Sequence, residues 1–220
     1  MIFRHFDLEN IETNGVTLRA AVHGDGPLVI LVHGWPELWY TWRHQIGPLA
    51  EAGYRVVAPD MRGYGGSDKP HEVEAYDMAS LMADVVGIID AFGEQTAILI
   101  GHDWGAPICW NTATLHAERV SAVAGLSVPH GKRGPGPVID LWRQIYHDKF
   151  FYQIYFQPEG VAGAKDMVRN FVPGHDSYKN AAAHCSDLRV NLVLDGIGHW
   201  VQQEAPDRVN QALLEFLASL

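Results

Sequence analysis

Short apolar runs alternate along this chain with longer segments of helical spacing, and this alternation limits the folds that the chain can adopt. Two of the runs, residues 28–32 (LVILV) and 54–58 (YRVVA), are rich in β-branched residues and are bounded by Gly, Pro or Asp. Such runs are typical of strands that are buried on both faces of a sheet. Residues 97–100 and 120–128 continue the series.

The segments between these runs connect one predicted strand to the next. They have helical spacing and cover residues 42–52, 78–92 and 107–117. Strands joined through helices need crossover connections, which produce a mostly parallel sheet. Ahead of them, residues 9–13 and 16–22 flank Asn14 and Gly15, a strong signal for a β-hairpin. The sequence therefore predicts an α/β fold, with a mostly parallel central sheet that is flanked by helices and opens with an antiparallel pair.

The rest of the chain contains one more strand pattern, one closing helix and a segment rich in aromatic residues. Residues 189–194 (RVNLVL) have the pattern of a strand, and residues 206–220 have that of an amphipathic helix with leucines on one side. Between residues 131 and 160, aromatic residues crowd together at largely helical spacing. We interpret that segment as an insertion placed over the sheet.

The composition limits the partners that the chain can bind. Its 220 residues are 47% hydrophobic, which is enough for one domain or for one domain with an added lobe. The 26 acidic and 16 basic residues give a formal charge of -10, which repels nucleic-acid backbones and anionic membrane surfaces. We therefore expect no nucleic-acid partner and no membrane partner.

The compartment is predicted from the start of the chain and from its cysteines. The first residues (MIFRHFDLENIETNG) are polar and acidic, unlike a signal peptide, and no apolar run approaches the roughly 20 residues of a membrane span. Cys109 and Cys185 match no metal-binding spacing and favour a reducing compartment. We expect a cytoplasmic protein without a metal or cofactor, and the sequence leaves open whether it forms a homodimer.

Residues 98–107 (ILIGHDWGAP) place a carboxylate where a predicted strand ends and a helix begins. Ligands of an open parallel sheet bind outside the carboxyl ends of its strands. Asp103 lies at such an end, and Gly101 and Gly105 flank it with the spacing Gly-x-nucleophile-x-Gly of a strand–turn–helix elbow. Small residues are needed there because strand and helix come close together while the central side chain is exposed. The sequence therefore predicts Asp103 as a nucleophile.

An aspartate at the elbow has a different chemistry from a serine. A carboxylate with a reference pKa of about 3.9 is ionised at pH 7 and needs no base to activate it. It can attack a saturated carbon and form an alkyl ester, and a histidine can then activate the water that hydrolyses this ester. The alternative is that Asp103 is only the N-cap of the following helix, and the other motifs weigh against that interpretation.

Two further motifs supply hydrogen-bond donors and a base. In HGWPE, residues 33–37, the turn can present the amide of Trp35 to the elbow, where it forms a pair of oxyanion donors with the amide of Trp104. Pro36 is a candidate for a cis peptide bond that orients this turn. His199 in DGIGHW follows a late predicted strand, the place where the base of such a triad is expected.

The acid that orients the histidine should lie between the nucleophile and His199 in the chain. Asp166 in AGAKDMV fits this order and would stabilise the imidazolium. Asp187, in a polar loop, and Asp195, three residues before Gly198, are weaker candidates.

Five motifs follow one another along nearly the whole chain. They are HGWPE (33–37), PDMRGYGGSDKP (59–70), GHDWGA (101–106), AGAKD (162–166) and GHW (198–200). Together they resemble the soluble epoxide hydrolases of the α/β-hydrolase fold. The resemblance implies Asp103 as nucleophile, His199 with Asp166 as the pair that activates water, and the amides of Trp35 and Trp104 as the oxyanion hole. It also implies hydrolysis of a small apolar epoxide to a vicinal diol, with water and without a cofactor.

The family that this chain resembles also uses two tyrosines of a cap domain, which hold and protonate the epoxide oxygen. The segment FYQIYFQPEG, residues 151–160, resembles the one that carries the first tyrosine, and we assign it to Tyr152, with Tyr155 in reserve. The alternative is a tyrosine that serves only for packing. The resemblance places four residues around the substrate pocket: His33, Pro36, Tyr155 and Trp200.

The interval before Asp166 is too short for the pattern of that family. Nine residues, 157–165, separate Phe156 from Asp166, where the family would finish its cap and form a whole buried strand. A buried strand takes about five or six mostly apolar residues. We therefore expect that the chain lacks an internal block with most of the cap and that strand, so the second tyrosine has no place. The predicted domains are a core of residues 1–130 and 162–220 and a partial helical cap of residues 131–161.

Three other functions are weighed against epoxide hydrolysis. A haloalkane or haloacid dehalogenase uses the same elbow aspartate, and the indole of Trp104 suits a departing halide, but HGWPE and the tyrosine segment favour the epoxide hydrolase. A weakly active or inactive binding protein of the same fold agrees with the short cap, whereas the intact Asp, His and Asp argue against it. A serine esterase or lipase is disfavoured by Asp103 itself.

Overall fold

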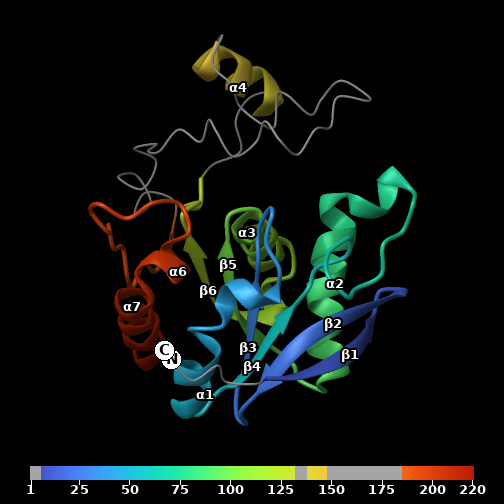
Figure 1. Ribbon diagram of the computed structural model, residues 1–220, viewed down its shortest axis with the longest axis horizontal. Helices are drawn as coiled ribbons and strands as arrows, with labels where there is room; N and C mark the ends of the chain where they lie inside the picture. Colours follow the sequence, from blue (N-terminus) through green and yellow to red (C-terminus); the bar gives the residue numbers. More distant parts are fainter. Residues whose placement is uncertain (1–5, 132–137, 148–184) are drawn as a thin grey trace.

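The computed structural model describes residues 6–131, 138–147 and 185–220. Its centre is a six-stranded sheet with the strand order β1-β2-β4-β3-β5-β6 (Figure 1). The strands are β1 Asp7–Thr13, β2 Val16–His23, β3 Leu28–Val32, β4 Arg55–Pro59, β5 Ala97–His102 and β6 Val120–Leu126. The last four strands are parallel to one another, and β2 pairs antiparallel with both β1 and β4. This confirms the predicted mostly parallel α/β fold that opens with an antiparallel pair.

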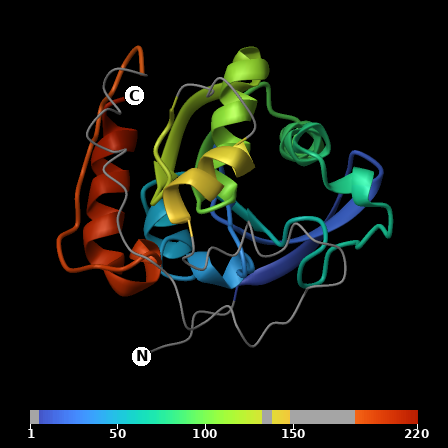
Figure 2. The ribbon, with the colours of Figure 1, turned by 90° about the horizontal axis from the view of Figure 1, so that it is seen from above.

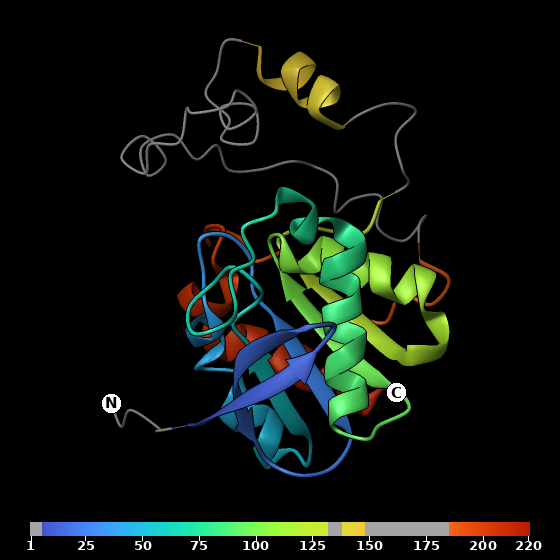
Figure 3. The same cartoon turned by 90° about the vertical axis from the view of Figure 1, so that its right-hand side faces the viewer.

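The hairpin of β1 and β2 forms where the sequence predicts it. Asn14 and Gly15 make the turn, with φ angles of 43 and 74 degrees, and Thr13 pairs with Val16 directly before and after it. Two successive residues with positive φ are what the tightest hairpin turn requires. Figure 3 shows the hairpin beside α2 Met78–Ala91, and Thr13 donates a hydrogen bond from its hydroxyl to the carbonyl of Asp84 on that helix.

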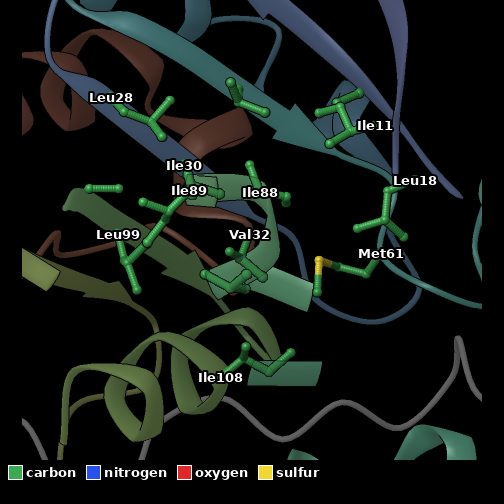
Figure 4. Packing of buried hydrophobic residues seen from close by; sticks show 14 of the residues in the cluster. Ile11, Leu18, Leu28, Ile30, Val32, Met61, Ile88, Ile89, Leu99 and Ile108 are labelled. Atoms are coloured by element: carbon green, nitrogen blue, oxygen red, sulfur yellow. The ribbon is translucent and has the colours of Figure 1, made fainter. Parts of the chain in front are cut away.

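Helices cover both faces of the sheet, as Figure 2 shows. On one face lie α2 and α3 Gly105–Leu115, and on the other lie α1 Ile46–Glu51 and α7 Pro206–Ala218. The side chains of β3 alternate between the two layers because successive residues of a strand point to opposite faces. Figure 4 shows Ile30 and Val32 in the α2 and α3 layer, while Leu31 packs in the α1 and α7 layer. This explains why a strand of five apolar residues is buried throughout.

The remaining described elements are short. They are η1 Trp39–Trp42, η2 Val73–Tyr76, η3 Ala117–Arg119, α4 Val138–Tyr146 and α6 Val201–Glu204. Within the described ranges, no helix combines the length and the apolar character needed to cross a membrane.

The predicted helix over residues 42–52 is only half correct. The structure has the short η1 and then α1, which begins at Ile46. Pro48 has no amide hydrogen and fits only the first turn of a helix, so the helix cannot extend far ahead of it. The predicted helices over 78–92, 107–117 and 206–220 are confirmed, with ends that differ by one or two residues.

The predicted strand at residues 189–194 is wrong. Those residues join no strand of the part of the chain that the structure describes, and Val190, Leu192 and Val193 are exposed. A strand forms by pairing with a neighbour, and the described sheet ends at β6. Arg189 instead donates to the carbonyl of Ser219 at 2.7 Å, which ties this stretch to the end of α7.

The predicted insertion is described only in part. Its described helix, α4, lies beyond the carboxyl ends of the parallel strands (Figures 1 and 3). The segment 148–184 lies outside the described residues, and the predicted boundary of the partial cap at residue 161 falls there.

Candidate active site

Asp103 lies on the turn that joins β5 to α3, where the elbow motif predicts it. Its φ of 51 degrees is in the left-handed region that residues other than glycine rarely adopt. A Cβ atom on Gly101 would lie 2.3 Å from the carbonyl oxygen of Gly105, and one on Gly105 would lie 2.0 Å from that of Val32. The two glycines therefore let the strands and the helix approach closely around the nucleophile position.

The two oxygens of the Asp103 carboxylate face different groups. Oδ1 accepts a hydrogen bond from the backbone amide of Trp35 at 2.8 Å. Oδ2 lies 3.2 Å from Nε2 of His199. Three motifs that are far apart in the sequence thus bring together the predicted nucleophile, one predicted oxyanion donor and the predicted base.

The HGWPE turn packs directly against Asp103, the predicted nucleophile. The peptide bond between Trp35 and Pro36 is cis, as predicted. A Cβ atom on Gly34 would lie 2.4 Å from Cβ of Asp103 and 2.5 Å from Oδ1. Only glycine therefore lets the Trp35 amide reach the carboxylate.

Trp104 follows Asp103 in the chain and is the N-cap residue of α3. It is 40% exposed although it is a large apolar residue. Its amide as the second oxyanion donor stays a prediction, and so does its indole as a ligand for a leaving group.

Glu37 is a buried carboxylate that links the HGWPE turn to two other elements. Oε2 accepts a hydrogen bond from the amide of Gly34 at 3.2 Å and lies 2.7 Å from Nδ1 of His102. Oε1 accepts hydrogen bonds from the Thr41 hydroxyl and from Nε2 of Gln202. Burial raises the pKa of Glu37, but the hydrogen bonds, with that from His102 first, outweigh it and hold the pKa below its usual value. Glu37 is therefore ionised.

His102 is fully buried and holds the backbone of the predicted base. Its Nε2 lies 2.8 Å from the carbonyl oxygen of His199, and its Nδ1 contacts Glu37. Both ring nitrogens of His102 thus lie within hydrogen-bond distance of an oxygen, one from the Glu37 carboxylate and one from the His199 carbonyl. The hydroxyl of Ser127 donates to the same His199 carbonyl at 2.7 Å. The ends of β5 and β6 thus fix His199 from one side.

Sequence reasoning missed Glu37 and His102 as parts of the site. Glu37 lies within the HGWPE motif and His102 within GHDWGA, directly before the predicted nucleophile Asp103. A polar side chain that is buried just beyond the end of a strand needs a hydrogen-bonding partner. That requirement was the signal that could have paired them.

His33 is buried and both of its ring nitrogens are occupied. Nδ1 donates to the carbonyl of Gly34 at 2.8 Å, and Nε2 accepts from the amide of Met61 at 3.0 Å. Accepting at Nε2 requires the neutral ring, and burial lowers the pKa of His33 below its usual value. His33 therefore supports the turn from behind, and its predicted contact with substrate stays a prediction.

Tyr64 packs edge-on against the His33 ring, with ring centroids 4.9 Å apart. Burial, followed by the negative charge of Asp103, raises the pKa of Tyr64 to about 12. The phenol therefore stays protonated at neutral pH.

Several predicted site residues cannot be placed. Asp166, Tyr152 and Tyr155 lie outside the described residues. Of the weaker candidates for the acid, Asp187 is exposed and forms an ion pair with Arg189 at 2.6 Å, and Asp195 is exposed on a turn. Neither exposed position suits the orienting acid, which leaves that role with Asp166 as a prediction.

Trp200 lies beside the predicted base. Its ring packs edge-on against that of His199, with centroids 5.4 Å apart. This position is compatible with the predicted pocket.

Comparison with known proteins identifies the family. The family model for the alpha/beta hydrolase fold matches residues 27–205. The chain belongs to this family. The elbow and the His199 loop both lie inside the matched region of this α/β hydrolase, whereas the hairpin of β1 and β2 precedes it.

The relatives of this α/β hydrolase include several epoxide hydrolases. Epoxide hydrolase A of Mycobacterium tuberculosis is 52% identical over 157 residues, which are 70% of this chain and 49% of that protein. The epoxide hydrolase of Caballeronia sordidicola is 43% identical over 211 residues, which are 96% of this chain and 57% of that protein. The crystal structure of epoxide hydrolase A from Mycobacterium thermoresistibile has a TM-score of 0.86 at 34% identity, covering 98% of this chain and 99% of that chain. The resemblance to the epoxide hydrolases is therefore confirmed, and the chain spans about half the length of the curated relatives it matches.

Proposed function

We propose that this α/β hydrolase converts an epoxide to a vicinal diol through an ester on Asp103. The observation that carries the proposal is the arrangement at the Asp103 carboxylate, with the Trp35 amide on Oδ1 and Nε2 of His199 beside Oδ2. The similarity to proteins named epoxide hydrolases supports the choice of substrate class. A small apolar epoxide and water are the proposed reactants, and the cytoplasm is the proposed location.

In the first step, Oδ2 of Asp103 attacks a carbon of the epoxide ring. A C–O ester bond forms as the ring C–O bond breaks, and the electron pair of the broken bond goes to the epoxide oxygen. That oxygen takes a proton from a tyrosine hydroxyl, for which the proposed donors are Tyr152 or Tyr155. Oδ1 becomes the carbonyl oxygen of the ester and keeps the hydrogen bond from Trp35.

In the second step, His199 takes a proton from water and the hydroxide attacks Cγ of Asp103. Negative charge develops on Oδ1, where the Trp35 amide already points, so the donor needs no reorganisation. The Cγ–Oδ2 bond then breaks, and the departing alkoxide takes the proton from His199. The new carboxyl group loses a proton that restores the tyrosine. Asp166 is proposed to stabilise the imidazolium of His199 during this step.

The domain organisation remains a proposal. We propose that the chain carries a partial cap over residues 131–161 and lacks the block of its relatives that would complete the cap and the strand before Asp166. A match to about half of the length of the curated relatives agrees with this. Intact-mass measurement of the purified protein tests it, since the printed sequence has a mass of 24.4 kDa and a clearly heavier species would contradict the deletion.

Dehalogenation is the second candidate because one observation favours it. The exposed Trp104 beside the nucleophile could hold a departing halide with its indole N–H. A halide needs donors but no proton, whereas an epoxide oxygen needs a proton donor. Release of bromide from bromoalkanes by a protein that leaves epoxides intact would establish the dehalogenase instead.

The test of the proposed function is the conversion of styrene oxide to its diol by wild type and by Asp103→Ala. We expect diol formation by the wild type and only the uncatalysed background in the variant. Asp25→Ala, in which an aspartate with a 97% exposed side chain is removed, is the matched control and should keep the wild-type rate. Equal rates in wild type and Asp103→Ala, or no diol from the wild type, would contradict the proposal.

A further inference from the structure

The carboxylate of Glu204 binds the backbone on both sides of His199. Oε2 accepts a hydrogen bond from the amide of Gly198 at 2.8 Å, and Oε1 accepts one from the amide of Trp200 at 3.1 Å. The two oxygens of one carboxylate thus hold the residue before the base and the residue after it. Hydrogen bonds to an ionised acceptor are stronger than those between neutral groups.

Gly198 leaves room for the Glu204 carboxylate in this arrangement. A Cβ atom at Gly198 would lie 2.8 Å from Oε1 of Glu204, 2.9 Å from Oε2 and 3.2 Å from the carboxyl carbon. The φ angle of Gly198 is not in the left-handed region, so backbone conformation alone does not require a glycine there. A side chain at position 198 would therefore displace the Glu204 carboxylate from its present place.

Side chains of other elements hold the His199 loop. Residues 189–194 join no strand within the part of the chain that the structure describes. The carbonyl of His199 is held by His102 and Ser127, and the amides on either side of His199 are held by Glu204. The loop is thus fixed from two directions by side chains.

Capping of α6 explains only half of this arrangement. Trp200 is the N-cap residue of α6, and Glu204 is the last residue of that helix. A side chain that reaches back to the N-cap amide is a common capping contact. The shorter hydrogen bond, to the amide of Gly198, lies outside the helix and holds the loop.

We propose that Glu204 is a positioning residue, which holds the His199 loop so that Nε2 faces the ester carbonyl and the attacking water. This inference rests on the proposed function and assigns Glu204 to its second step. Attack by Asp103 on the epoxide uses the carboxylate and the Trp35 amide and does not use His199. Loss of Glu204 should therefore slow hydrolysis of the ester and leave its formation unchanged.

Single-turnover kinetics separate the two steps. Glu204→Gln keeps the size of the side chain but leaves one amide facing an NH2 group, and Gly198→Ala pushes the carboxylate away. In both variants we expect alkyl-enzyme to form at the wild-type rate with styrene oxide and to hydrolyse about tenfold to a hundredfold more slowly, as for a displaced catalytic group. Glu215→Gln, on the exposed side of α7, is the matched control and should match the wild type in both steps.

Amide hydrogen exchange measures the hydrogen bonds of Glu204 to the loop in the absence of substrate. We expect the amides of Gly198 and Trp200 to exchange about tenfold faster in Glu204→Gln than in wild type or Glu215→Gln, because each loses an ionised acceptor. Unchanged exchange at both amides would overturn the contacts themselves. A second outcome concerns the case in which amide exchange changes and the wild type forms diol. If Glu204→Gln then hydrolyses the ester at the wild-type rate, the positioning role is overturned. If the wild type forms no diol, the proposed function fails and the positioning role fails with it, while the exchange result still decides whether Glu204 holds the loop.

Discussion

The amide nitrogen of Trp35 lies 2.8 Å from Oδ1 of Asp103, and Nε2 of His199 lies 3.2 Å from Oδ2 of the same carboxylate. The two oxygens are therefore not equivalent. One is held by a backbone donor that can stabilise an oxyanion, and the other is directed toward the base. This asymmetry supports the proposal that Oδ2 attacks and Oδ1 becomes the ester carbonyl.

Gly34→Ala should disrupt the donor at Oδ1. The new Cβ would lie within 2.5 Å of both Cβ and Oδ1 of Asp103, so the HGWPE turn must move away from the nucleophile. A displacement of about 1 Å at a catalytic group can cost about a hundredfold in rate, and we expect a loss of that order in kcat/KM for styrene oxide.

Gly131→Ala is the control for this substitution. Gly131 has open space around the position of a Cβ and no positive φ, so activity should be retained. Circular dichroism of both variants separates displacement of the turn from unfolding. A folded Gly34→Ala protein with wild-type kcat/KM would contradict the role of the Trp35 amide.

His199→Gln should stop the reaction at the ester. Without a base to activate water, the alkyl-enzyme accumulates on Asp103. Intact-mass spectrometry should show a protein heavier by the mass of one styrene oxide, and peptide mapping should place the adduct on Asp103. The double variant Asp103→Ala with His199→Gln should show no adduct, whereas an adduct there would place the nucleophile elsewhere.

Protonation of His33 should weaken the fold as the pH falls. Because burial lowers its pKa in the folded protein below the unfolded value of 6.5, the unfolded state binds the proton more readily. The stability that depends on neutral His33 is complete above about pH 6.5 and is lost as the pH falls below it, by at most about 1.4 kcal/mol per pH unit.

Denaturant unfolding between pH 7 and pH 5 measures this dependence. In His33→Gln the side-chain oxygen can still accept from the Met61 amide, but nothing titrates, so the free energy of unfolding should fall less steeply than in wild type. His71→Gln removes an exposed histidine and should keep the wild-type slope. Identical slopes in wild type and His33→Gln would show that His33 is not buried as a neutral ring.

Glu37 and His102 should be strongly coupled in stability. Glu37→Gln replaces the buried carboxylate that lies 2.7 Å from Nδ1 of His102 by a neutral amide, and breaking a buried ion pair in this way costs about 3–5 kcal/mol. In a double-mutant cycle, Glu37→Gln and His102→Gln each lower the free energy of unfolding. The sum of these two losses should be much larger than the loss in the double variant. Additive losses would contradict the ion pair.

The sequence was sufficient to predict the elements whose residues carry their own local signals. The Asn14–Gly15 turn, the buried strands and the glycines around Asp103 are examples, and each follows from backbone sterics or from periodicity. The cis bond before Pro36 was also predicted. So was the contact of His199 with Asp103, because chain order at the carboxyl ends of a parallel sheet limits which groups can meet.

The remaining features depend on neighbours that local patterns do not encode. Residues 189–194 have the composition of a strand, but a strand also needs a partner, and none of the described strands pairs with them. The contacts of Glu37 and Glu204 join residues from separate elements, Glu37 with His102 and Glu204 with the loop around His199. Asp166 and Tyr152 lie outside the described residues, so their roles stay predictions.

The covalent ester on Asp103 is the centre of this mechanism, and isotope transfer in a single turnover tests it most directly. Excess enzyme is mixed with styrene oxide in water labelled with oxygen-18, and the diol and the peptide that contains Asp103 are both analysed by mass spectrometry. Because hydroxide attacks Cγ of Asp103, the label should enter the aspartate and the diol should carry no label. A labelled diol and an unlabelled Asp103 peptide would show that water attacks the epoxide directly, and would contradict the mechanism.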